Sequence, residues 1–179
     1  DARDWHYEAL NKALELFGMP ISRYDHLTTF DGLPTRRKLD MLTLERGLPR
    51  ELHDLLNELK QQYTMEMVHV QCKPRFNHEY ALSMLKAAGY QLAVCSNSIR
   101  NTVEAMMRKA CLEPYLDLMI SNEDVSRGKP DPEMYLKAMV HFGLEPEECL
   151  VVEDNENGIR AARAAGAHLM VVRSVDEVN

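Results

Sequence analysis

The sequence has no long apolar run, no close cysteine pair and no block of like charges, and each absence argues against a class of protein. Its longest apolar runs, about six residues, fall far short of the roughly 20 that cross a bilayer, so we expect no membrane partner. No basic and apolar leader opens the chain, which predicts a soluble protein. The net charge of −7, without five consecutive like charges, argues against a nucleic-acid partner.

The cysteines and the composition point to an ordinary globular protein. None of the four cysteines shows CxxC spacing, and two of them lie inside apolar runs, which predicts reduced core thiols in a cytoplasmic protein rather than disulfides. A chain of 179 residues, 45% hydrophobic and 27% charged, can form one or two compact domains.

The first part of the chain has apolar residues at helical spacing. The pattern predicts an amphipathic helix from Asp1 to Phe17, a second helix between Pro34 and Gly47, and a third after Pro49 with few β-branched residues. We therefore expect a helical domain over residues 1–73.

The second part, residues 74–179, alternates between strand and helix patterns. Continuous apolar runs predict strands at residues 91–96, 116–121, 149–154 and 168–172. Helical patterns lie between them, at residues 76–88, 101–111, 132–142 and 157–165. Continuous apolar strands interleaved with helices indicate a parallel sheet covered on both faces, so the fold class is α/β with a Rossmann-like core.

In such a sheet the ligand site lies outside the carboxyl ends of the strands. Ser96, Asn97 and Ser98 follow the first strand at the start of a helix, where they can cradle a phosphate or simply cap the helix. Lys129 stands between Gly128 and Pro130, flanks more rigid than those of most surface lysines, although a solvated loop lysine is the alternative.

An acid pair follows the third strand. Glu153 and Asp154 stand directly after Val152, where buried carboxylates need a partner such as Mg²⁺; a capping cluster for the next helix is the alternative. Hydroxyl, amide, lysine and acid pair at one sheet edge together suit phosphoryl transfer. The sequence shows no activated nucleophile to accompany them, and its seven histidines show no metal-binding spacing.

Three segments carry a family resemblance. The segments from Ala93 to Ser98, from Ser126 to Tyr135 and from Val151 to Gly166 resemble the second, third and fourth motifs of the haloacid dehalogenase superfamily, in the same order. The helical first part resembles the cap of the branch containing phosphoglycolate phosphatase and β-phosphoglucomutase. The resemblance implies a Mg²⁺-dependent phosphohydrolase that acts on a small phosphorylated metabolite through an aspartyl-phosphate.

The resemblance also implies roles for individual residues. Ser96 and Lys129 would be catalytic and would bind the phosphoryl group together with Asn97, whereas Glu153 and Asp154 would hold Mg²⁺ directly or through water. Dehalogenases that need no metal lack this acid pair, so its presence favours phosphate chemistry.

The family's first motif, an Asp-x-Asp-Gly loop at the end of the central strand, is not found in the sequence. It normally supplies the nucleophile and stands shortly before a helix like the one that begins at Asp1. We expect the strand and its aspartates to lie upstream. A strand from another polypeptide and a truncated domain are the alternatives, because a sheet without its middle strand leaves edges unpaired.

Residues of the helical domain are candidates for substrate recognition. His6 falls where the phosphomutases have a cap-hinge histidine, and the loop from Thr28 to Arg37 resembles the segment that sets specificity. Arg36 is the first candidate there and Arg37 the second, because arginine binds phosphate or carboxylate with two hydrogen bonds; solvated side chains are the alternative for all three.

The leading hypothesis is therefore a phosphatase. The alternatives are a β-phosphoglucomutase-like phosphotransferase and, if the first motif is truly absent, an inactive pseudo-phosphatase or binding module.

Overall fold

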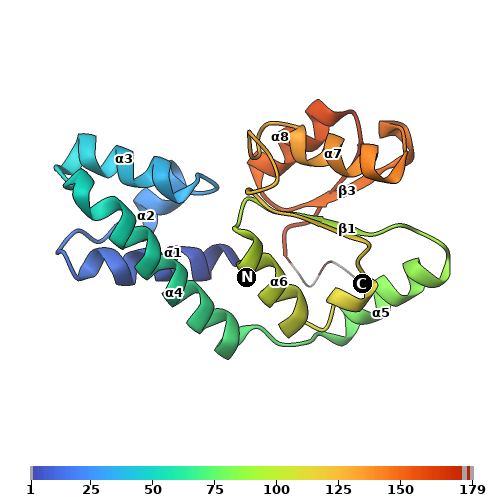
Figure 1. The fold of residues 1–179 in the computed structure, drawn as a ribbon, viewed down its shortest axis with the longest axis horizontal. Helices are drawn as coiled ribbons and strands as arrows, with labels where there is room; N and C mark the ends of the chain where they lie inside the picture. The colour runs from blue at the N-terminus through green and yellow to red at the C-terminus, as the bar shows by residue number, and fades with distance from the viewer. Residues whose placement is uncertain (1, 175–176, 178–179) are drawn as a thin grey trace. The chain divides into compact units, whose positions relative to one another are not determined.

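The computed structural model describes residues 2–174 and residue 177 (Figure 1). The chain divides into two compact units, the first ending at Gln71 and the second beginning at Cys72. Within the described residues, no helix is both long and apolar enough to cross a membrane.

The first unit is helical, as predicted. Its elements are α1 (Ala2–Glu15), α2 (Arg23–Asp25), the π-helix η1 (His26–Phe30), α3 (Thr35–Arg46), the 3-10 turn η2 (Arg50–Leu52) and α4 (His53–Gln71). The α3 helix ends at Gly47, whose φ of 73° lets its N–H reach the carbonyls of Leu42 and Thr43. Leucines of α1, α3 and α4 pack with Phe30, which is 1% exposed, in one core.

The segment from Thr28 to Arg37, predicted to be a loop, is helical at both ends. Thr28, Thr29 and Phe30 lie in the π-helix η1, and Phe30 is buried in the core rather than presented to a ligand. Arg36 and Arg37 stand exposed in the first turn of α3, whereas the next residue, Lys38, is buried.

The second unit alternates helices and strands at the positions predicted from the sequence. Its elements are α5 (Phe76–Ala87), β1 (Ala93–Cys95), α6 (Arg100–Lys109), η3 (Glu113–Tyr115), β2 (Leu118–Ile120), α7 (Glu133–Phe142), η4 (Pro146–Glu148), β3 (Leu150–Glu153), α8 (Glu156–Ala165) and β4 (His168–Val171). The α/β fold class is therefore confirmed.

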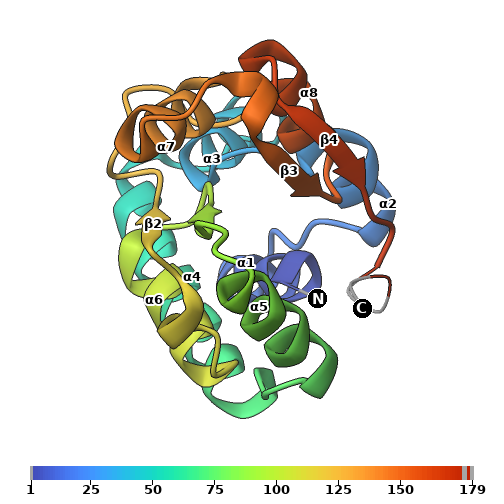
Figure 2. The same cartoon turned by 90° about the vertical axis from the view of Figure 1, so that its right-hand side faces the viewer.

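The strands form two parallel pairs instead of the single sheet expected. The β1 strand pairs with β2, Val94 opposite Met119, and β3 pairs with β4, Val151 opposite Leu169. Figure 2 shows the two pairs with β1 and β3 as their inner strands. Each of these two keeps one edge that no described strand pairs with.

The two strand pairs nevertheless share a core. Cys95 of β1 and Val151 of β3 both pack against a buried cluster from α7 and α8 that includes Tyr135 and Met139. The cluster holds the carboxyl ends of β1 and β3 on the same side, which is where the predicted site residues follow the strands.

Candidate active site

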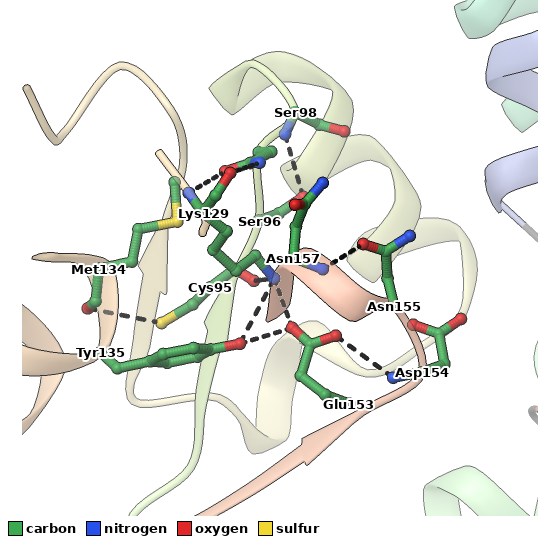
Figure 3. A network of polar contacts seen from close by, with 11 residues as sticks. Cys95, Ser96, Ser98, Lys129, Met134, Tyr135, Glu153, Asp154, Asn155 and Asn157 are labelled. Carbon is green, nitrogen blue, oxygen red and sulfur yellow. Dashed lines mark hydrogen bonds and ion pairs between the residues drawn. The ribbon is translucent and has the colours of Figure 1, made fainter. Parts of the chain in front are cut away.

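The structure brings together five of the residues predicted from the sequence. Ser96 and Asn97 follow β1. Lys129 precedes α7, and Glu153 and Asp154 stand at the end of β3 (Figure 3). His6 and Arg36 belong to the helical unit, so their surroundings are described separately.

Lys129 is the centre of the cluster. Its side chain is only 12% exposed, and Nζ donates to the Cys95 carbonyl at 3.1 Å and to Glu153 Oε1 at 2.5 Å (Figure 3). The ammonium group is thereby fixed at the carboxyl end of β1, although in the sequence Lys129 follows the strand predicted at residues 116–121. A buried and oriented charge of this kind stabilises the negative charge of a transferring phosphoryl group more strongly than a solvated lysine does.

Asn97 holds the backbone of Lys129 on both sides. The Asn97 Oδ1 accepts from the Lys129 N–H at 2.9 Å, and Nδ2 donates to the Lys129 carbonyl at 2.9 Å. A Cβ on Gly128 would come within 2.7 Å of Asn97 Oδ1, so these two hydrogen bonds require glycine at position 128. Asn97 was predicted to bind phosphate, whereas its side-chain contacts indicate that the amide positions Lys129.

The Ser96 hydroxyl, predicted to donate to a phosphate oxygen, is able to donate a hydrogen bond. Its Oγ accepts from the backbone N–H of Ser98 at 3.1 Å, which leaves the hydroxyl proton to be donated to an incoming oxygen atom. The same contact shapes the turn that leads into α6.

The loop that carries Lys129 is braced at two further points. The carboxylate of Glu133 accepts from the N–H groups of Ser126 and Arg127, at 2.8 and 2.9 Å. Asp124 accepts from the Arg100 guanidinium and from Ser121, contacts that lower the pKa of its carboxyl group to about 2. Both carboxylates therefore hold the backbone of this loop in its conformation.

Sequence reasoning missed Tyr135, the third member of the buried polar group. Its hydroxyl donates to Glu153 Oε1 at 2.5 Å and lies 3.5 Å from Lys129 Nζ. Burial, with the nearby Glu153 charge, raises the pKa of Tyr135, so the phenol stays protonated and can donate. Helical spacing was a signal for it, because Tyr135 shares the buried face of α7 with Ala138 and Met139.

The metal prediction fits the described residues only in part. Glu153 is 8% exposed and its carboxylate is engaged by Lys129 and Tyr135, whereas Asp154 is exposed (Figure 3). No group of three or more His, Cys, Asp or Glu residues in the described part of the chain could hold a metal ion. Of the two acids predicted as ligands, Asp154 is the exposed one, and one carboxylate alone is not a Mg²⁺ site.

Gly158, in the first turn of α8, also escaped sequence reasoning. A Cβ at this position would overlap the Glu153 carboxylate. We predict that Gly158→Ala displaces that carboxylate from Lys129 and lowers the free energy of unfolding by about 1 to 3 kcal/mol, as overpacking does. Denaturant unfolding measures the loss.

The control for this variant is Gly143→Ala. Gly143 has a φ of +67°, and nothing lies within 4 Å of the Cβ that alanine would add, so the change strains only the backbone, by about 1 kcal/mol. A crystal structure of each variant should show the contact between Lys129 and Glu153 lost only in Gly158→Ala. An intact contact in Gly158→Ala would contradict this interpretation.

Comparisons with known proteins cover both units of the chain. A family profile described as haloacid dehalogenase-like hydrolase matches residues 1–172. A phosphorylated carbohydrates phosphatase of Thermotoga maritima is 29% identical over 99% of this chain and 82% of its own length. A phosphoglycolate phosphatase of Aquifex aeolicus is 30% identical over 88% of this chain and 72% of its own. The crystal structure of CbbY from Rhodobacter sphaeroides with phosphate superposes with a TM-score of 0.84 at 21% identity, covering 97% of this chain and 81% of that one.

Proposed function

This chain belongs to the haloacid dehalogenase-like hydrolase family, and from that premise we propose that it hydrolyses the phosphate monoester of a small metabolite. The observation that carries the proposal is the Lys129 ammonium, buried and fixed at the carboxyl end of β1 beside Ser96. Lys129 neutralises the charge of the phosphoryl group, Ser96 donates a hydrogen bond to one of its oxygen atoms, and Asn97 holds Lys129 in place.

The nucleophile, in this proposal, is an aspartate carried by a strand between β1 and β3. The inner edges of β1 and β3, which no described strand pairs with, support it, since backbone N–H and C=O groups of a parallel sheet need a partner strand. Leu150 and Val152 of β3 are 58% and 49% exposed, which is unusual for a strand of this apolar character. A strand seated there would end next to Lys129.

We propose further that a divalent cation, Mg²⁺, assists the reaction and that Asp154 is this segment's contribution to its site. Bound Mg²⁺ would supply additional positive charge to the phosphoryl group. Glu153 is not offered as a ligand, because it neutralises Lys129.

The experiment adds a strand of this kind to the chain. We would fuse an apolar strand ending in Asp-x-Asp-Gly before residue 1 and measure phosphate release from a panel of sugar phosphates and phosphoglycolate with Mg²⁺. A matched fusion ending in Asn-x-Asn-Gly is the control. We expect release, and a mass increase of one phosphoryl group on the enzyme, from the aspartate fusion alone.

Equal release from both fusions would refute the strand nucleophile. Formation of an isomeric sugar phosphate without phosphate release would favour the phosphotransferase instead. Binding of phosphate with no turnover by either fusion would favour a binding module.

A further inference from the structure

Two loops meet at the carboxyl ends of the paired strands β1 and β2. The β1 loop, residues 96–99, runs into α6 and carries Ser96, whereas the β2 loop, residues 121–124, leads toward Lys129. The strands themselves are only three residues long, so the geometry of the loops beyond them depends on contacts that the loops make with each other.

The backbone of the β1 loop is held by the β2 loop. The N–H of Asn122 donates to the Ser98 carbonyl at 3.1 Å, and the N–H of Arg100 donates to Glu123 Oε2 at 2.7 Å. The N–H of Ser98 donates in turn to Ser96 Oγ (Figure 3). The position of the hydroxyl that is proposed to meet the phosphoryl group therefore depends on a turn that the β2 loop supports.

The guanidinium of Arg100 joins the same two loops through a charged contact. Arg100 Nη2 lies 2.6 Å from each carboxylate oxygen of Asp124. Asp124 Oδ2 also accepts from the N–H and the hydroxyl of Ser121, which is 1% exposed, at 2.8 and 2.7 Å. Lys137 of α7 donates to the Asp124 carbonyl at 2.5 Å. Asp124 thus links the start of α6, the end of β2 and the helix that follows Lys129.

A similar ion pair lies at the other end of the same two strands. Lys86 Nζ is 2.7 Å from Asp117, which precedes β2 and also accepts from the N–H of Leu92, the residue before β1. The exposed fractions are comparable, 33% and 34% for this pair and 41% and 28% for Arg100 and Asp124. Because only the pair with Arg100 lies at the edge of the proposed phosphoryl site, the two pairs separate an effect on stability from an effect on position.

We propose that Arg100 is a positioning residue for phosphoryl transfer, which fixes, through Asp124, the turn that presents the Ser96 hydroxyl relative to the Lys129 ammonium group. The inference rests on the proposed function and adds to it a residue that acts through another side chain. Groups that stabilise a transition state act only when they are held in place, and a displacement of about 1 Å can cost roughly 100-fold in rate.

The experiment uses the Asp-x-Asp-Gly fusion as parent, with Arg100→Met as the test variant and Lys86→Met as the matched control. Phosphate release over a range of substrate concentrations separates kcat from KM. Arg100→Met should lower kcat by roughly tenfold to 100-fold and leave KM close to that of the parent, because the displaced donors act in the transition state. Lys86→Met should keep the kcat of the parent.

A double-mutant cycle tests whether Arg100 acts through Asp124. Asp124→Asn should lower kcat by a factor similar to that of Arg100→Met, and the double variant should lose no more than either single variant, because the two side chains act as one pair. Losses that multiply in the double variant would show that Arg100 acts without Asp124 and would overturn the positioning role.

Amide hydrogen exchange of the chain without the fusion tests the contact between the loops. Arg100→Met should speed exchange at the N–H of Asn122, while the amides of α7 keep the protection of the parent, which shows that the second unit is folded. Lys86→Met should leave exchange at Asn122 unchanged.

The outcomes distinguish this inference from the proposed function. Equal kcat values for Arg100→Met and Lys86→Met, with an active parent fusion, would overturn the inference alone. Unchanged exchange at Asn122 in Arg100→Met would also overturn it, since Arg100 would then not hold the two loops together. No phosphate release by the parent fusion would instead refute the proposed function, and the inference with it.

Discussion

Replacing Lys129 with methionine is expected to lower the free energy of unfolding by about 3 kcal/mol, because the Glu153 carboxylate then stays buried without its cation. The effect is large because the two side chains are only 12% and 9% exposed. Adding Glu153→Gln should recover most of the loss, since a neutral amide can still accept from the Tyr135 hydroxyl. Urea unfolding of the two variants measures both steps.

An exposed ion pair provides the control. Lys86 and Asp117 are 2.7 Å apart but 33% and 34% exposed, so Lys86→Met should cost less than about 1 kcal/mol. If Lys86→Met and Lys129→Met cost the same, burial does not distinguish the pair at the site. If Glu153→Gln fails to rescue Lys129→Met, the loss comes from something other than the unpaired carboxylate.

Acidification is expected to destabilise the helical unit through His6. Burial, with the charges of Lys60 and Lys38, lowers the pKa of His6 from 6.5 to about 3 in the folded protein. Between these two values the unfolded chain binds a proton that the folded chain does not. Stability is therefore complete above pH 6.5 and is lost as the pH falls toward 3. The shift corresponds to about 5 kcal/mol.

Trp5, the only tryptophan, reports this transition because it precedes His6 in α1. Its fluorescence during urea unfolding should give a free energy that falls steadily below pH 6.5 in the parent. His6→Gln should flatten that slope, because glutamine can accept from Lys60 without titrating. His168→Gln, at an exposed position of β4, should keep the parent's slope. An unchanged slope in His6→Gln would contradict the assignment.

The sequence predicted the elements and the edge of the site because both follow from periodicity. Apolar runs of strand length and helical spacing placed β1 to β4 and their helices, and parallel strands bring Ser96, Lys129 and Asp154 to one edge. What the pattern could not supply was the partner of each polar side chain. Asn97 was expected to contact a phosphate and Glu153 a metal, yet both side chains contact Lys129.

The helical unit shows the same limit. The series Leu56, Lys60, Thr64 and Val68 has the spacing of a buried face, so a lysine within it was visible as an exception in the sequence. Arg36 was predicted from the chemistry of arginine alone, which does not tell on which side of the helix a residue lies. The α3 helix begins at Thr35, and its buried side carries Lys38 and Leu39. Side-chain type alone does not tell which polar residue is buried.

The most direct test of the proposed function is phosphate release by the Asp-x-Asp-Gly fusion with and without the pair Lys129→Met and Glu153→Gln. Because the double variant keeps the fold but lacks the ammonium group, release should fall by roughly 100-fold to 1,000-fold, as when an enzyme loses a preorganised donor to the transition state. Release that stays at the level of the parent fusion would contradict the claim that the Lys129 edge of the sheet carries phosphoryl transfer.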